Sequence, residues 1–221
     1  MKVNTDGVLL GALAPILPSD RTAIDIGTGT GTIALMLAQR YSDAGIPVQL
    51  TGIDIDGPSA SEATANFNAS PWSDRLNSLH CSLNEFSPSG KFDLIVSNPP
   101  FFDESLKNQD ARVSEARHGI SLSYKDILSF AESRLTSEGR VALILPADTE
   151  KGLLREARSH SLFVSSTIRV SATSDKAPAR IVVTFTRNRY SSPMEKTISI
   201  QDSGAYTPEY LHLMRDFYLF A

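Results

Sequence analysis

An asparagine, two prolines and an aromatic residue follow an apolar stretch, in the order Asn98, Pro99, Pro100, Phe101. The apolar stretch, FDLIVS over residues 92–97, predicts a buried strand. Proline has no N–H and fixes its own φ, so the two prolines end the strand in a rigid turn. The turn holds the Asn98 Oδ1 and the Pro99 carbonyl as acceptors beside an aromatic face. This arrangement suits a planar substrate that is held by its amine.

A glycine-rich loop and a later acid form a second group. The predicted strand over residues 22–27 runs into Gly27, Gly29 and Gly31, just ahead of a predicted helix. Such a loop lets a ligand approach bare backbone N–H groups at the helix start. Asp54 ends the next predicted strand, where a carboxylate can accept from both hydroxyls of a ribose. The dinucleotide-binding fingerprint G-x-G-x-x-G would need a glycine at position 32. This chain has Thr32 there, so the loop does not match that fingerprint.

With Asp25 ahead of the first glycine, the loop resembles motif I of class I S-adenosylmethionine-dependent methyltransferases. The resemblance implies S-adenosylmethionine as the cofactor and adds Asp25 and Thr28 to the expected cofactor contacts. This fold usually places an acid after the third strand, where it accepts from the adenine amine. The chain has Ser82 at that position, with Asn84 and Glu85 close by. Ser82 is therefore the expected adenine contact.

The two groups together predict methyl transfer to a nitrogen whose lone pair is delocalised. Such an amine is a poor nucleophile. Acceptors on its hydrogens, here the Asn98 Oδ1 and the Pro99 carbonyl, would turn its lone pair toward the methyl group. The prolines place these acceptors before substrate arrives, so orientation supplies the catalysis, worth several kcal/mol. No general base is required at first, because the methylated nitrogen becomes acidic. Asn98 is expected to contact the cofactor as well as the substrate.

The elements that must position these residues alternate along the chain. Strands are predicted over residues 22–27, 48–56, 78–83, 92–97 and 140–146, and helices over 32–42, 59–70, 123–135 and 151–159. Strands over 163–170 and 180–187 predict an antiparallel hairpin at the end of the sheet. The pattern predicts an α/β fold with a doubly wound Rossmann-like sheet, mostly parallel with a C-terminal antiparallel hairpin. The resemblance of the glycine loop implies that this is a class I methyltransferase sheet. Ligands bind such sheets at the carboxyl ends of the strands.

Bulk composition is that of an ordinary globular domain. The chain has 221 residues, of which 41% are hydrophobic and 21% charged, so we expect one methyltransferase domain over residues 1–221. The net charge of −4 argues weakly against a broad electrostatic grip on nucleic acid, but it leaves room for a local basic patch. Cys81 is the only cysteine, and we interpret it as a buried free thiol of a cytoplasmic protein.

Metal and membrane partners are not expected. The four histidines lie far apart and none forms a recognised ligand pair with another histidine or with Cys81. The chain has no apolar run near the roughly 20 residues that span a bilayer, and no signal peptide is visible.

Several further stretches narrow the resemblance. The Asn-Pro-Pro-aromatic turn resembles amino-methyltransferases that act on adenine, guanine or glutamine. Together with NPPFF, the whole chain closely resembles the bacterial tRNA(Val) adenine N6-methyltransferase family. The stretches that carry this likeness span residues 2–12, 68–76, 116–118, 121–123, 206–210 and 215–219.

The resemblance implies methylation of the exocyclic N6 amine of the adenine just 3′ of the anticodon in tRNA(Val). It places the cofactor on the glycine loop and Asp54, and the adenine on the turn from Asn98 to Phe101. Thr5 and Asp6 would lie by the methionine end of the cofactor, or would only cap a helix. Family members usually carry a segment ahead of this region, so we expect that N-terminal segment to be missing here.

RNA contacts are expected on both sides of the site. Phe102, Lys107, Arg112, Arg117 and His118 follow the catalytic turn, and Lys176, Arg180 and Arg169 lie on or near the hairpin. These residues could receive phosphates and form one contiguous patch, or they could each belong to a solvated charged face.

Two other functions compete with this one. A protein glutamine N5-methyltransferase of release factors shares the turn, but normally carries a separate N-terminal helical domain. A non-catalytic RNA-binding module would keep the fold without turnover, and the intact loop, acid and turn speak against it. We expect a monomer.

Overall fold

The central strands are nearly continuous runs of buried residues, and successive side chains point to opposite faces, so each strand is buried on both faces. The computed structural model describes residues 4–100 and 122–218 of the chain. In β4, Leu94 and Val96 join one hydrophobic cluster, whereas Phe92 and Ile95 join the other. Two-sided burial of this kind is typical of a parallel sheet with helices on both faces.

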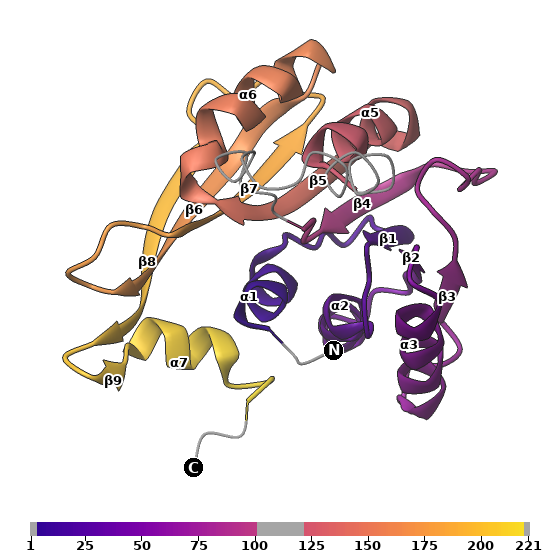
Figure 1. Ribbon diagram of the computed structural model, residues 1–221, viewed down its shortest axis with the longest axis horizontal. Helices are drawn as coiled ribbons and strands as arrows, with labels where there is room; N and C mark the ends of the chain where they lie inside the picture. The colour runs from indigo at the N-terminus through magenta and orange to yellow at the C-terminus, as the bar shows by residue number, and fades with distance from the viewer. Residues whose placement is uncertain (1–3, 101–121, 219–221) are drawn as a thin grey trace, which may run out of the picture.

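The described residues form one nine-stranded sheet in the order β3-β2-β1-β4-β5-β7-β6-β8-β9 (Figure 1). Strands β1 to β5 pair in parallel, β7 runs antiparallel to β5 and β6, β8 is parallel to β6, and β9 is antiparallel to β8. The strands are β1 (Thr22–Ile26), β2 (Gln49–Asp54), β3 (Leu76–His80), β4 (Phe92–Ser97), β5 (Leu135–Pro146), β6 (Phe163–Thr173), β7 (Arg180–Thr186), β8 (Met194–Asp202) and β9 (Ala205–Tyr206).

Helices cover both faces of the sheet. α1, α2 and α3 lie on one face, and α5 and α6 lie on the other (Figure 1). The short C-terminal helix α7 packs beside β8. The helices are α1 (Thr5–Leu13), α2 (Thr32–Asp43), α3 (Gly57–Ala69), α5 (Tyr124–Arg134), α6 (Glu150–Ser159) and α7 (Pro208–Met214), with a 3₁₀ turn η2 at Ala147–Thr149.

The predicted fold class is confirmed, with two corrections. The predicted hairpin is present as β6 and β7, but it does not end the sheet, because β8 and β9 extend it. β8 was missed because its pattern is weak: its first four residues are exposed and Ile198 is its buried residue. The third strand spans Leu76–His80 rather than residues 78–83. It is an edge strand with little buried surface to mark it.

A buried ion pair holds the segment between α1 and β1 against β5. Arg140 and Asp20 are 3% and 1% exposed, and Arg140 donates to both carboxylate oxygens of Asp20. The Tyr41 hydroxyl donates to Asp20 Oδ2 at 2.7 Å, and Arg140 Nε donates to the Pro15 carbonyl at 2.9 Å. The network therefore sets where α1 ends, and α1 begins at the cavity described next.

Candidate active site

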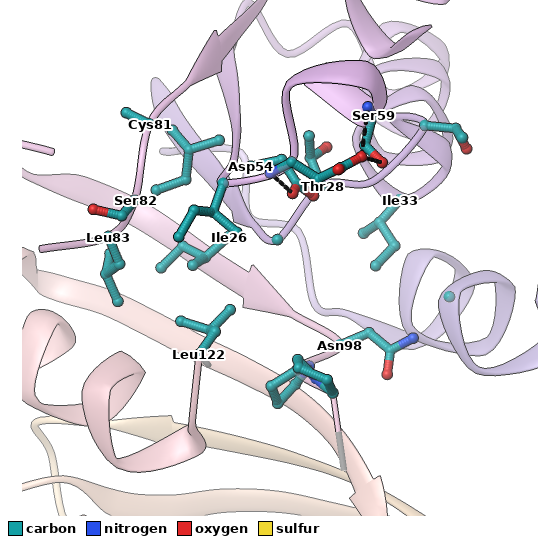
Figure 2. Close-up of a pocket in the computed structure, with 18 of the residues that line it drawn as sticks. Ile26, Thr28, Ile33, Asp54, Ser59, Cys81, Ser82, Leu83, Asn98 and Leu122 are labelled. Carbon is teal, nitrogen blue, oxygen red and sulfur yellow. Dashed lines mark hydrogen bonds between the residues drawn. The ribbon is translucent and has the colours of Figure 1, made fainter. Parts of the chain in front are cut away.

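A cavity of about 1150 Å³ opens at the carboxyl ends of β1, β2 and β4. Figure 2 shows Ser82 and Leu83 toward one end of its lining, Asp54 and Thr28 between, and Asn98 toward the other end. A cavity at this edge of a doubly wound sheet is where ligands of such folds bind. The structure thus brings the glycine loop and the Asn98 turn to one place, although about seventy residues of sequence separate them.

The glycine loop needs its glycines for backbone reasons. Gly27, Gly29 and Gly31 have φ of 72°, 57° and 86°, in the left-handed region that favours glycine. A Cβ on Gly31 would lie 2.4 Å from Phe67 Cε1 of α3. The loop is therefore pressed against α3 and turns directly into α2. Gly27 lines the cavity, whereas Gly29 and Gly31 are not among the described residues that line it.

Asp25 lies beneath the loop rather than in the cavity lining. It is 0% exposed, and Thr28 Oγ1 donates to Asp25 Oδ2 at 2.7 Å. Burial raises the pKa of Asp25 to about 7, and the hydrogen bond from Thr28 opposes that rise. Thr28 itself lines the cavity. Asp25 thus contacts a residue of the cavity lining without being part of it, and its contact with the cofactor stays a prediction.

Asp54 is held at the mouth of the loop by backbone amides. Gly29 N donates to Asp54 Oδ2 at 2.7 Å, and Asp56 N donates to Asp54 Oδ1 at 2.9 Å (the latter dashed in Figure 2). Each carboxylate oxygen has a second lone pair, so a ribose hydroxyl can still bind to either one. Two amides therefore fix the orientation of the carboxylate.

Ser82 pairs with Glu85 in the segment after β3. Ser82 Oγ donates to Glu85 Oε2 at 2.7 Å, and Glu85 N donates back to Ser82 Oγ at 3.3 Å. The hydrogen bonds from Ser82 hold the pKa of Glu85 below its usual range. Both residues line the cavity, as does Asn84. A fixed carboxylate therefore stands at this end, next to the Ser82 that replaces the usual acid.

Apolar side chains wall the same end of the cavity. Ile26, Leu83 and Leu122 line it there and offer faces to a planar base (Figure 2). Cys81 lines it as well and is only half-buried, so its interpretation as a buried thiol was wrong. Partial burial and the nearby Glu85 raise the pKa of the Cys81 thiol, which disfavours a nucleophilic role.

Asn98 presents an unsatisfied acceptor. Its Oδ1 is buried and has no hydrogen-bond partner among the described residues. Ser97 Oγ donates to the Ile26 carbonyl at 2.6 Å, which ties the end of β4 to the end of β1. Pro99 is buried and Pro100 is exposed, and both line the cavity with Asn98. Buried acceptors normally have partners, so this one is available to a ligand amine.

The start of α1 closes another side of the cavity. Asn4 caps the helix, because its Oδ1 accepts from Gly7 N at 2.6 Å, and Asn4, Asp6 and Gly7 line the cavity. Thr5 is exposed and is not among the described lining residues. Sequence reasoning missed Asn4 as a site residue, although its position just ahead of a helical run marks it as an N-cap. It also missed Ser59 and Leu122, because no local sequence pattern marks either position as part of a binding site.

Few of the predicted RNA contacts fall on the described chain. Lys176 is exposed in the turn between β6 and β7. Arg180, at the start of β7, donates through Nε to Asp6 Oδ2 at 2.8 Å. Arg169 pairs with Glu150 and Glu195. Phe101, which was predicted to be catalytic, lies outside the described residues. The remaining predicted RNA contacts lie outside them as well, so the contiguity of the patch stays a prediction. Those contacts are Phe102, Lys107, Arg112, Arg117 and His118.

Residues 4–100 and 122–218 contain no group of three or more histidine, cysteine or acidic side chains that could hold a metal ion. Within the same residues, each helix is too short or too polar to cross a bilayer.

Solved structures share the fold at low sequence identity. A predicted O-methyltransferase of Agrobacterium tumefaciens superposes with a TM-score of 0.68 at 16% identity, over 96% of each chain. A TehB-like SAM-dependent methyltransferase of Corynebacterium glutamicum superposes with a TM-score of 0.53 at 19% identity, over 85% of this chain and 89% of the other. These likenesses place the chain in the class I methyltransferase fold.

Sequence relatives are much closer. The family described as "Methyltransferase small domain" matches residues 6–150. Curated proteins named tRNA1(Val) (adenine(37)-N6)-methyltransferase are 39% identical in Flavobacterium johnsoniae and 38% identical in Bacteroides fragilis. The alignments cover 99% of this chain and 93% and 91% of those proteins. The chain belongs to the tRNA1(Val) (adenine(37)-N6)-methyltransferase family and carries its methyltransferase small domain.

Proposed function

We propose that the protein methylates the exocyclic N6 amine of an adenine in tRNA, at position 37 of tRNA(Val), with S-adenosylmethionine as methyl donor. The observation that carries the proposal is the buried, unpartnered Asn98 Oδ1 in the same cavity as the glycine loop and Asp54. The relatives named above supply the substrate, since each of them carries that activity in its name.

The proposed cofactor site follows the cavity lining. Asp54 accepts from the ribose hydroxyls, and the backbone around Gly27 and Thr28 faces the rest of the nucleoside. Ser82 lies beside the adenine. Asp6, at the start of α1, faces the methionine ammonium group, which a carboxylate attracts.

The proposed catalytic turn orients the substrate amine. Asn98 Oδ1 and the Pro99 carbonyl accept from the two N6 hydrogens, and the lone pair then faces the methyl group. S-adenosylmethionine supplies that methyl as the electrophile of a sulfonium. Phe101 stacks on the adenine, which is unstacked from an already single-stranded anticodon loop at small cost. Because the prolines fix the acceptors, the turn contributes mainly by orientation.

A transfer assay tests the proposal. Unmodified bulk tRNA and a release factor are offered in parallel with labelled S-adenosylmethionine, and nucleosides are identified by mass spectrometry. N6-methyladenosine from tRNA alone is the expected result. Label in the release factor would assign the chain to the glutamine methyltransferases instead.

The Asn98→Ala variant tests whether the turn is catalytic. We expect the rate of methyl transfer to fall by about 10²–10³, since one preorganised hydrogen-bonding group is lost at the reacting atom. Affinity for tRNA should change little. Unchanged turnover by this variant would refute the catalytic role of the turn. A wild-type protein that binds tRNA without turnover would instead be a non-catalytic RNA-binding module.

Three accompanying proposals concern context. The protein acts as a monomer, with tRNA as its macromolecular partner, and it acts in the cytoplasm, where the proposed substrate is found. The single domain over residues 1–221 remains a prediction.

A further inference from the structure

The outer face of α6 carries a row of basic residues. Lys151, Arg155 and Arg158 are all exposed, and they stand at positions i, i+4 and i+7 of the helix. Residues with that spacing lie on one face, so the three charges extend over about 10 Å of helix. The opposite face buries Leu153 and Ala157 against the sheet. We call the three residues the α6 stripe.

Carboxylates do not neutralise the stripe. Among the described residues, no hydrogen bond or ion pair joins Lys151, Arg155 or Arg158 to an acid. The two acids within the helix face other partners: Glu150 binds Arg169, and Glu156 lies 3.5 Å from His160. Asp148 is exposed in η2, ahead of the helix. Elsewhere on this acidic chain, exposed bases such as Arg215 and Lys196 do have acidic partners.

The stripe leads away from the candidate active site. η2 and then α6 follow Pro146, the last residue of β5, which pairs with Arg180 at the cavity edge of the sheet. The helix then crosses β6 and β7 toward the opposite edge, where Phe163 begins β6 (Figure 1). The stripe therefore starts near the sheet edge that carries Asn98 and ends near the far edge.

A second cavity lies where the stripe ends. It measures about 560 Å³, and its lining includes Arg158, Phe163, Arg189 and Tyr190 but no acidic residue among the described ones. The Arg189 guanidinium stands 4.5 Å over the Phe163 ring, and Tyr190 is 51% exposed. Guanidinium groups beside exposed aromatic rings suit a phosphate with its neighbouring base.

We propose that the α6 stripe and this second cavity bind the phosphate backbone of the RNA substrate, outside the anticodon loop held at the active site. The inference rests on the proposed function. It explains how a chain with a net charge of −4 engages a polyanion: three exposed bases, for which no acidic partner is found among the described residues, lie on one helix that leads out from the site. Contacts of this kind position RNA and carry no sequence information.

The test replaces the stripe with Lys151→Gln, Arg155→Gln and Arg158→Gln together. A matched control, Lys91→Gln, Arg75→Gln and Arg215→Gln, removes the same charge from exposed or half-exposed sites outside α6. Binding of unmodified tRNA is measured by fluorescence anisotropy as a function of NaCl concentration. We expect the stripe variant to lose at least tenfold in affinity near 0.15 M salt. The slope of log affinity against log salt should fall by about 2, since each lost phosphate contact removes about 0.7 to 0.9.

Further readouts separate the stripe from the rest of the protein. For the stripe variant, KM for tRNA should rise with kcat nearly unchanged, and affinity for S-adenosylhomocysteine by calorimetry should equal that of the wild type. If the triple variant does not fold, Arg155→Glu alone serves as the second variant. A stripe variant that binds tRNA with wild-type affinity and salt slope overturns the inference, as does an equal loss in the control.

The two proposals fail in different ways. If the wild type methylates tRNA and the stripe variant binds tRNA like the wild type, only the inference about the α6 stripe is overturned. If the wild type neither binds nor methylates any tRNA, the proposed function is overturned, and the inference about the α6 stripe fails with it.

Discussion

Two buried side-chain oxygens near the site, Asp25 Oδ1 and Asn98 Oδ1, lack a hydrogen-bond partner among the described residues. An unsatisfied buried acceptor costs about 1–3 kcal/mol. Asn98 lines the cavity, so a bound amine can supply the missing donor. Asp25 lies below the loop and outside the described cavity lining, and the loss of solvation on burial raises its pKa to about 7.

Asp25 predicts a pH dependence of stability. Its pKa rises from 3.8 to about 7 on folding, so between those pH values the folded protein keeps a proton that the unfolded chain loses. Stability from this group is full below about pH 4 and is lost as pH rises to about 7. Relative to Asp25→Asn, the free energy of unfolding of the wild type should therefore fall across this range, by on the order of 4 kcal/mol. Urea unfolding of both proteins at several pH values measures it. A difference that stays constant with pH would contradict the assignment.

Gly31 predicts a steric effect on stability. An added Cβ would lie 2.4 Å from Phe67 Cε1, at a φ of +86°. Gly31→Ala should lower the free energy of unfolding by roughly 2–4 kcal/mol, from overpacking together with left-handed strain. Gly45→Ala is the matched control, since its φ is +69° and nothing lies within 4 Å of the added Cβ. The control should cost only about 1 kcal/mol in the same urea titration. Equal losses in the two variants would show that Phe67 does not matter.

At the scale of elements, α1 is positioned by contacts with distant strands. Asp6 binds Arg180 of β7, 174 residues away, and the segment after α1 is held by the Arg140–Asp20 pair. A buried pair often adds little net stability, but the loss of one partner leaves a charge without compensation. The placement of α1 over the cavity therefore depends on both partners being present.

Arg140→Met should lower the free energy of unfolding by roughly 3–5 kcal/mol, because it leaves Asp20 buried without a cation. Adding Asp20→Asn should restore more than about 1 kcal/mol, since the Asn amide can still accept from Tyr41. Denaturant unfolding of the single and double variants measures this coupling. Arg215→Met, from an exposed pair, serves as control and should change stability by less than about 0.5 kcal/mol. A double variant no more stable than Arg140→Met would argue against an uncompensated charge.

At the scale of the whole molecule, ligand binding and folding are linked. S-adenosylhomocysteine at about a hundred times its Kd should raise the free energy of unfolding by about 2.7 kcal/mol. At the same concentration Asp54→Ala should lose most of that gain, because Asp54 accepts from Gly29 N and is the proposed contact of the ribose. Thermal unfolding with and without ligand measures the effect. Asp74→Ala, with its carboxylate 72% exposed and away from the cavity, should keep the full gain. Full stabilisation of the Asp54 variant would exclude Asp54 from the site.

The amino-acid sequence by itself determined the alternation of strands and helices, the glycine loop, Asp54 and the Asn98 turn. Each of these is a local pattern: a hydrophobic period, a run of glycines, or a proline pair after an apolar strand. Parallel strands also share one carboxyl edge, so the sequence predicted that the loop and the turn would meet. Family resemblance then narrowed the reaction that these residues perform.

Only the tertiary structure decided which side chains touch. It placed Asp25 under the loop, paired Ser82 with Glu85, and joined Asp6 to Arg180. It also extended the sheet with β8, whose largely exposed residues show little hydrophobic period. The stripe on α6 has a helical spacing that can be read in the sequence, but its lack of acidic partners cannot. These features depend on which distant segments pack together, and that is set by burial over the whole core rather than by any local pattern.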